Sequence, residues 1–117
     1  MTDLEYACPL TPAVFHILLA LATSDKHGYE IMKAVRRDSN GSVKMGNGTL
    51  YGSLKRMLAD GLIEDAGERA DSDDTRRKYY RLTPRGRAAM HAEIQRYRDT
   101  LNVIATYQLA PNPLPED

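Results

Sequence analysis

The stretch from Gly46 to Gly61 alternates apolar and polar positions at helical spacing. Its apolar positions are Leu50, Leu54, Met57 and Leu58. This spacing predicts a helix that buries one side in a core. The other side carries hydrogen-bonding and cationic groups, at Asn47, Thr49, Tyr51, Gly52, Lys55 and Arg56. Such a helix can enter a DNA major groove while it packs in a core, although an ordinary surface helix fits this stretch alone equally well.

Two further helices are predicted before this stretch. Thr11-Pro12 is a helix start, and the apolar run that follows it belongs in the middle of the core. His16 in that run fits a packed, hydrogen-bonded histidine better than a ligand. Ser24-Asp25 is expected to cap the second helix, which ends near Asn40-Gly41.

The positive end of the second helix carries polar and basic side chains, at Lys26, His27 and Tyr29. Backbone N–H groups there can meet a phosphate. An equally open interpretation is that these side chains only cap and solvate the first turn.

Two strands are predicted after the third helix, at Leu62-Ile63-Glu64 and from Lys78 to Leu82, with a charged hairpin tip from Glu68 to Thr75. A hairpin in this place forms the wing of a winged helix. Tyr80 and Leu82 share one face of their strand and should seal it to the core. The cations of the wing, which can reach a DNA backbone or minor groove, are Arg76, Arg77 and Lys78.

A long last helix is predicted from Thr83-Pro84 to about Leu109. Its apolar seam consists of Met90, Ile94, Tyr97, Leu101 and Ile104. The seam is narrower than the stripe of a core-facing helix, so a second copy of the chain is the economical partner, giving a two-fold dimer. Alternatively, the helix folds back on its own domain.

The predicted fold class is therefore mainly α with a small β-hairpin (α+β): a winged helix-turn-helix followed by one long C-terminal helix. The predicted segments are an N-terminal arm (1–9), a DNA-binding domain (10–82), a dimerisation helix (83–109) and a flexible tail (110–117).

Charge is segregated along the chain although the net charge is zero. Residues 26–56 hold seven lysines and arginines against two acids, and residues 60–74 hold seven acids against Arg69 alone. Residues 76–87 hold six cations and no acid. Two basic blocks separated by an acidic one predict a single anion-facing side.

Other functional classes find little support in the sequence. Cys8 is the single cysteine, and no Cys/His spacing resembles a metal site, so neither a metal nor a cofactor is expected. His16, His27 and His91 lie on different helices with no nucleophile–base spacing, so we expect no catalytic residues and no enzyme. Without a signal peptide or a membrane-length apolar run, the expected location is cytoplasmic, with no membrane partner.

Four segments of the chain together resemble the PadR family of bacterial winged-helix transcriptional regulators: LTPAVFHILLALA, HGYEIM, GTLYGSLKRMLADGLIE and RRKYYRLTPRG. The resemblance spans Leu10 to about Ile104. It implies a homodimeric repressor on double-stranded DNA with a pseudo-palindromic operator. The family's groove-entering helix maps onto Asn47 through Arg56, and its wing contacts map onto Arg76, Arg77 and Lys78. The single last helix resembles that of the short subgroup, in which it crosses its partner.

The resemblance also implies a site for a small-molecule effector. Some members of the short subgroup bind flat aromatic or phenolic compounds at the dimer seam, and Tyr97 corresponds to an aromatic wall of that pocket. Phe15, Ile94 and Leu101 are further candidate walls, although plain dimer packing is the favoured interpretation for these three. The chain has no tryptophan, which weakens any stacking on a ligand.

Roles on DNA follow from side-chain chemistry. Phosphate contacts, which position a protein without reading sequence, are assigned to Lys26, Lys55, Arg56, Arg76, Arg77 and Lys78. Base contacts are assigned to Asn47, Thr49 and Tyr51. The alternative function is a winged-helix adaptor that binds a protein instead of DNA. Acids at Lys55, Arg56 and the wing positions would favour the adaptor, and this chain carries bases there.

Overall fold

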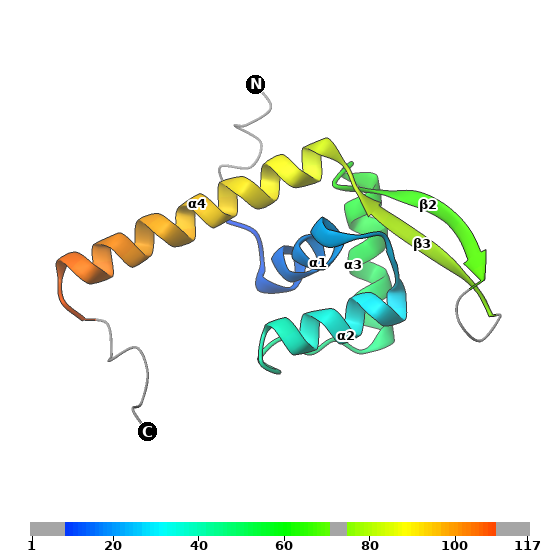
Figure 1. The fold of residues 1–117 in the computed structure, drawn as a ribbon, viewed down its shortest axis with the longest axis horizontal. Coiled ribbons are helices and arrows are strands. Elements are labelled where there is room, and N and C mark those ends of the chain that lie inside the picture. The colour runs from blue at the N-terminus through cyan, green and yellow to red at the C-terminus, as the bar shows by residue number, and fades with distance from the viewer. Residues whose placement is uncertain (1–8, 71–74, 110–117) are drawn as a thin grey trace.

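The structure is a computed structural model that describes residues 9–70 and 75–109. Its elements in chain order are α1 (Pro12–Thr23), β1 (Lys26–His27), α2 (Gly28–Asp38), α3 (Asn47–Ala59), β2 (Ile63–Ala70), β3 (Arg76–Leu82) and α4 (Pro84–Thr106). Helices α1, α2 and α3 cluster around one core, the β2–β3 hairpin extends from one side, and α4 extends from the other (Figure 1). This is the predicted α+β winged-helix fold.

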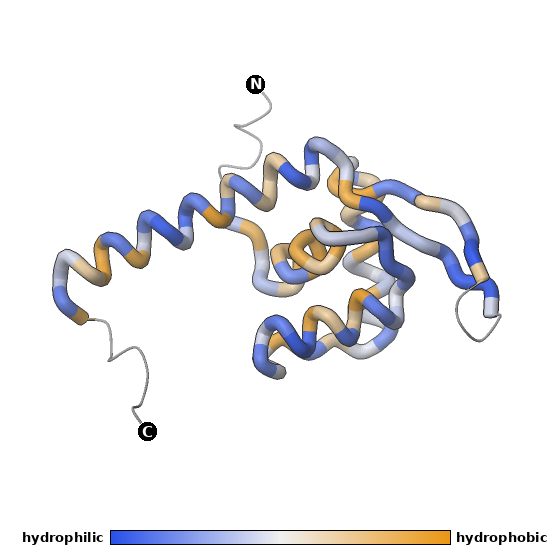
Figure 2. The backbone as a smooth tube through the Cα atoms, in the orientation of Figure 1, coloured by the Kyte–Doolittle hydropathy of each residue, from blue (hydrophilic) through white to orange (hydrophobic). Residues whose placement is uncertain are grey.

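Helix α1 lies at the centre of the core, as its almost continuous apolar sequence predicts. Ile17 and Leu18 are completely buried, and Leu50 and Leu54 of α3 are 1% exposed. The most hydrophobic backbone segments accordingly lie in α1 and on the sides of the other elements that surround it (Figure 2). Burial of these side chains stabilises the domain by roughly 1.5–3 kcal/mol each.

Threonine side chains cap the N-termini of two helices at the predicted places. Thr11 Oγ1 accepts a hydrogen bond from the Val14 N–H at α1, and Thr83 Oγ1 accepts one from the Gly86 N–H at α4. A proline follows each threonine as the first helical residue. Each cap stabilises its helix by about 1 kcal/mol.

The predicted cap of α2 at Ser24-Asp25 is wrong. Helix α2 begins at Gly28 and its N-cap is His27, whose Nδ1 accepts from the Glu30 N–H while the Glu30 carboxylate accepts from the His27 N–H. Ser24 is instead the C-cap of α1. The sequence pattern for a cap is local, and here a short strand, β1, separates Asp25 from the helix.

The sheet has three antiparallel strands in the order β1-β3-β2, one more than the sequence predicted. Lys26 pairs with Tyr80, and Ile63 pairs with Leu82. A register shift between Asp65 and Glu68 bends β2. Both hairpin strands are longer than predicted, because β2 continues to Ala70 and β3 begins at Arg76, so part of the expected tip is strand. Of that tip, residues 71–74 lie outside the described residues.

Helix α4 is joined firmly to the domain only along its first half. Gly86, Ala89, Met90 and Glu93 are buried, whereas Tyr97 and Leu101 are exposed. A Cβ on Gly86 would clash with the backbone carbonyl oxygen of Leu62, so this contact requires glycine. Glu93 Oε1 also accepts the Leu10 N–H at 3.1 Å, which ties the chain before α1 to α4.

The predicted end of the last helix at about Leu109 is three residues late, since α4 ends at Thr106. Of the predicted arm (1–9) and tail (110–117), residues 1–8, including Cys8, and 110–117 lie outside the described residues.

Candidate nucleic-acid interface

The outer face of α3 is exposed along its whole length, and it consists of Asn47, Thr49, Tyr51, Gly52, Lys55 and Arg56. The opposite stripe, with Leu50, Leu54 and Met57, is buried. Helix α3 therefore presents every one of the predicted polar and basic groups to solvent while its apolar side fixes it in the core.

Tyr51 leans from this outer face onto the beginning of α2. A Cβ on Gly28 would lie 2.8 Å from Tyr51 Cζ and even closer to its hydroxyl oxygen. The ring can take this position only because residue 28 has no side chain. Tyr51 nevertheless remains 50% exposed, so it keeps a surface for contacts with another molecule.

A hollow of about 280 Å³ brings the outer face of α3 together with the wing. It is lined by His27, Gly28, Tyr51, Thr75, Arg76, Arg77, Lys78 and Tyr80. Tyr51 and all three predicted wing cations thus border one concave surface, although they are about 25 positions apart in the sequence. Tyr51 is the one residue of the predicted α3 face in this lining, which does not include Asn47, Thr49, Gly52, Lys55 or Arg56.

The strand β3 leaves the core toward the hairpin tip, because Arg76 and Lys78 lie on the same face as Tyr80 and Leu82 but are exposed. Tyr80 and Leu82 are buried as predicted, while Arg76, Lys78 and Arg81 are exposed. Two of the exposed cations have acidic neighbours within the hairpin: Lys78 Nζ lies 3.3 Å from Asp65 Oδ2, and Arg76 Nε lies 3.7 Å from Glu68 Oε1. Pairs between exposed groups are weak because solvent and salt screen them, so a polyanion can compete for these cations.

Asp25 joins the wing to the helices. Its carboxylate accepts hydrogen bonds from Arg81 on β3 and, at 2.7 Å, from Arg69 Nη2 on β2. The hydrogen bond from Arg81, followed by the one from Arg69, holds the pKa of Asp25 below its usual range. The Arg69 guanidinium also lies over the Tyr79 ring, 4.5 Å from its centroid. One carboxylate therefore fixes both wing strands to the turn between α1 and α2.

Lys26 and His27 are placed differently from what a phosphate contact requires. Lys26 Nζ donates to the Ala20 carbonyl oxygen at 2.7 Å and to the hydroxyl groups of Thr23 and Ser24, so it caps the end of α1. His27 is 5% exposed and serves as the N-cap of α2. The alternative interpretation of this cluster, as caps of helix ends, describes both residues better. Tyr29, by contrast, is 52% exposed.

The predicted apolar seam of α4 divides into two parts. Met90 is 4% exposed in the core of its own domain, and Ile94 is partly buried against that core. Tyr97 and Leu101 are 44% and 62% exposed, and Ile104 is partly exposed. The alternative of folding back on the domain thus describes the first part of the helix, and only the second part offers a surface to a partner.

The candidate effector residues Phe15 and Tyr97 are in contact. Their rings meet edge to face with centroids 5.1 Å apart, and Phe15 is 8% exposed. The neighbouring His16 is packed as predicted, but its buried Nδ1 has no hydrogen-bond partner among the described residues. Phe15 is therefore a buried support beneath the exposed ring of Tyr97.

Sequence reasoning missed Asp25, Arg69 and Arg81 as a group. Arg81 belongs to the basic block of residues 76–87, but nothing local in the sequence relates it to an acid 56 positions away. Within residues 9–70 and 75–109, no cluster of histidine, cysteine, aspartate and glutamate could hold a metal ion. No helix in that part of the chain is long and apolar enough to cross a membrane.

Comparison with known proteins agrees with this arrangement. Residues 17–92 match the Transcriptional regulator PadR-like family. The chain belongs to this family. It is also 37% identical over 75 residues to Transcriptional regulator Rv3488 of Mycobacterium tuberculosis, an alignment that covers 64% of this chain and 65% of that protein.

Solved structures of PadR regulators share the fold. A PadR family transcription regulator from Clostridium difficile is 29% identical, with a TM-score of 0.69 and coverage of 84% of this chain and 99% of that one. Bacillus subtilis PadR in complex with operator DNA is 19% identical, with a TM-score of 0.58 and coverage of 89% and 50%. At this identity the second likeness shows the fold alone.

Proposed function

We propose that this PadR-like protein is a sequence-specific, DNA-binding transcriptional regulator that acts as a homodimeric repressor on a pseudo-palindromic operator. The observation that carries the proposal is the shared concave surface formed by Tyr51 of α3 and the cations Arg76, Arg77 and Lys78 of the wing. Groups that can read base edges and groups that can hold phosphates thus face the same side.

Roles within the interface follow from exposure. Asn47, Thr49 and Tyr51 on α3 meet base edges, and Gly52 leaves room for close approach to the groove. Phosphates are held by Lys55, Arg56 and the three wing cations. Lys26 and His27 are engaged at helix ends, although His27 also borders the hollow, and Tyr29 is the exposed group there.

Dimerisation rests on the second half of α4. The apolar side chains of Tyr97 and Leu101, with Ile104 on the same side, stay exposed or partly exposed when residues 9–70 and 75–109 are considered alone. A second copy crossing this region buries them and presents two reading helices to adjacent half-sites. Met90 stays in the core of its own domain and contributes only by holding the helix in place.

Regulation by an aromatic or phenolic small molecule at the dimer seam is the finer part of the proposal. Tyr97 offers an exposed aromatic face supported by Phe15, with Leu101 one turn farther along and Ile94 at the edge of the core. An effector acts only if it binds DNA-competent and DNA-incompetent dimers with different affinity. A thermal-shift screen in which no phenolic compound raises the melting temperature would count against this part.

The experiment that tests the proposal is a binding titration at several salt concentrations, with the DNA upstream of the protein's own coding region and with scrambled DNA of equal length. We expect preference for the first DNA and a steep loss of affinity with salt. Lys55→Ala should weaken binding to both DNAs alike. Tyr51→Phe keeps the packing on Gly28 and should reduce only the preference for the operator, if the hydroxyl group reads a base.

The second candidate, an adaptor that binds a protein, predicts no steep salt dependence with either DNA. Failure of the wild-type protein to bind both DNAs at low salt would favour the adaptor and overturn the proposed function.

A further inference from the structure

A stripe of exposed side chains runs along α2 on the side that faces away from the core. Tyr29, Lys33 and Arg36 lie at positions i, i+4 and i+7 of the helix, and all three are exposed. Positions with this spacing share one face. The stripe is separate from the outer face of α3, and the basic residues of α2 in it have no role in the interface described above.

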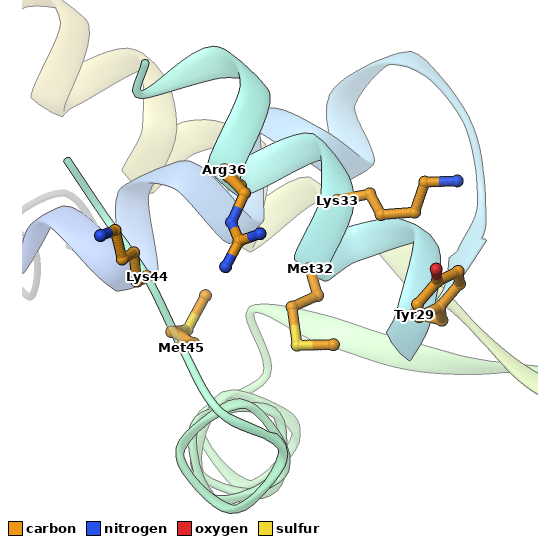
Figure 3. A pocket seen from close by; sticks show the side chains of 6 residues that line it. All are labelled: Tyr29, Met32, Lys33, Arg36, Lys44 and Met45. Carbon is orange, nitrogen blue, oxygen red and sulfur yellow. The ribbon is translucent and has the colours of Figure 1, made fainter. Parts of the chain in front are cut away.

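The stripe borders a hollow of about 170 Å³ between α2 and the link that leads into α3. Its lining consists of Tyr29, Met32, Lys33, Arg36, Lys44 and Met45. Figure 3 shows Met32 and Arg36 extending from α2 toward the link that carries Met45. The two methionines supply an apolar floor, and the three cations stand around its rim.

The cations of this rim are available for an external anion. In residues 9–70 and 75–109, no carboxylate lies within 4.0 Å of Lys33, Arg36 or Lys44. Arg37 on the same helix differs, because its Nε lies 3.1 Å from Asp38 Oδ1.

The stripe continues the cationic surface of the wing. The Tyr29 ring has Lys33 Nζ at 5.1 Å and Arg77 Cζ at 6.0 Å from its centroid, so it connects β3 to α2. At the other end, Lys44 precedes Gly46, the N-cap of α3. A track of cations therefore passes from Arg77 of the wing, along α2, to the link before α3.

The form of this track fits a polyanion better than a small anion. The cations are spread along a line and do not converge on one point, as a site for a single phosphate would require.

We infer that Lys33, Arg36 and Lys44 form a second phosphate track, which holds the backbone of duplex DNA beside the groove that α3 enters. The inference rests on the proposed function and extends it to residues that the outer face of α3 and the wing do not include. Contacts of this kind position the domain on the duplex and carry no sequence information.

The test compares a triple variant, Lys33→Ala/Arg36→Ala/Lys44→Ala, with the control Arg37→Ala in the full-length protein. Binding to operator DNA and to scrambled DNA is measured by fluorescence anisotropy from about 50 to 200 mM salt. Each lost phosphate contact should reduce the fall in affinity over this range by about threefold. The triple variant should lose affinity for both DNAs by the same factor, while Arg37→Ala keeps the salt dependence of the wild type.

Three outcomes separate the inference from the proposed function. If wild-type protein binds the operator and the triple variant keeps its salt dependence, the second track is wrong and the function stands. If wild-type protein binds neither DNA at low salt, both fail. Lys44 lies outside any helix, so Lys44→Ala alone should lose one phosphate contact even if the triple variant is impaired in folding. An unchanged salt dependence for Lys44→Ala would likewise overturn the second track.

Discussion

The carboxylate of Asp25 holds the guanidinium group of Arg81 through two hydrogen bonds, from Nη2 to Oδ2 at 2.9 Å and from Nε to Oδ1 at 3.3 Å. This two-point geometry fixes the orientation of the arginine as well as its distance. Because Arg69 of the other wing strand binds the same carboxylate, the wing is fixed to the helices at a residue that makes no contribution to the cationic surface.

Asp25→Asn should loosen the wing without unfolding the domain. We expect a loss of about 1 kcal/mol in the free energy of unfolding, since the two arginine side chains are 42% and 49% exposed and solvent screens the pairs. Amide hydrogens of β2 and β3 should exchange faster, which hydrogen-exchange mass spectrometry measures. Glu64→Gln is the matched control, because Glu64 Oε2 lies 3.7 Å from Arg81 Nη1 but belongs to the wing itself. Equal exchange in both variants would show that Asp25 does not hold the wing.

The contribution of Asp25 should depend on pH in the acid range. Its pKa in the folded protein lies below the ordinary value of 3.8, chiefly because Arg81 donates to the charged form. The stabilisation is therefore complete above pH 3.8 and is lost as the pH falls through the lower, folded pKa. Urea unfolding of wild type and Asp25→Asn from pH 7 to 2 should show a stability gap that closes toward the acid end. A gap that stays constant to pH 2 would contradict this assignment.

Two glycine substitutions should have opposite consequences. In Gly28→Ala the new methyl group meets the end of the exposed Tyr51 side chain, which can swing aside, so stability should fall little while operator preference falls. In Gly86→Ala the methyl group meets the backbone of Leu62, which cannot move freely, so the loss should exceed about 2 kcal/mol. Thermal unfolding together with DNA titration distinguishes the two. A strongly destabilised Gly28→Ala protein would mean that Tyr51 is held more rigidly than its exposure suggests.

The proposed dimer can be tested on the exposed half of α4. Leu101→Glu places a charge within the proposed interface and should give monomers at micromolar concentration in light scattering coupled to size-exclusion chromatography. Val103→Glu is the control, because Val103 is 51% exposed but lies on another side of the helix. Circular dichroism should be unchanged in both. A dimeric Leu101→Glu protein would place the interface elsewhere.

How far the sequence predicted this molecule depends on the range of the interactions involved. The apolar stripe of α3, the threonine-proline helix starts and the core face of Tyr80 and Leu82 are local patterns, and the structure confirms them. The role of Asp25 was not predictable, because its partners are 44 and 56 positions away. A local cap pattern at Ser24-Asp25 therefore gave the wrong start for α2.

The seam of α4 illustrates the same limit. Its spacing of four and three residues is regular from Met90 to Ile104, and spacing alone cannot tell which residues the chain itself covers. The position of α1 decides this, since Phe15 contacts Tyr97, whereas Leu101 one turn farther along is 62% exposed. The exposed face of α3 was predicted more fully, because exposure of a polar helix face follows from burial of the opposite face.

The way α4 is anchored has a mechanical consequence. Its first three turns are locked to the domain by Gly86, Met90 and the buried carboxylate of Glu93, and no hinge interrupts the helix before Thr106. The helix is roughly 34 Å long, so a small tilt imposed on its far end becomes a rotation of the entire domain, wing included. If a second copy holds the distal half, as proposed, the tilt of this helix sets the angle at which α3 and the wing are presented.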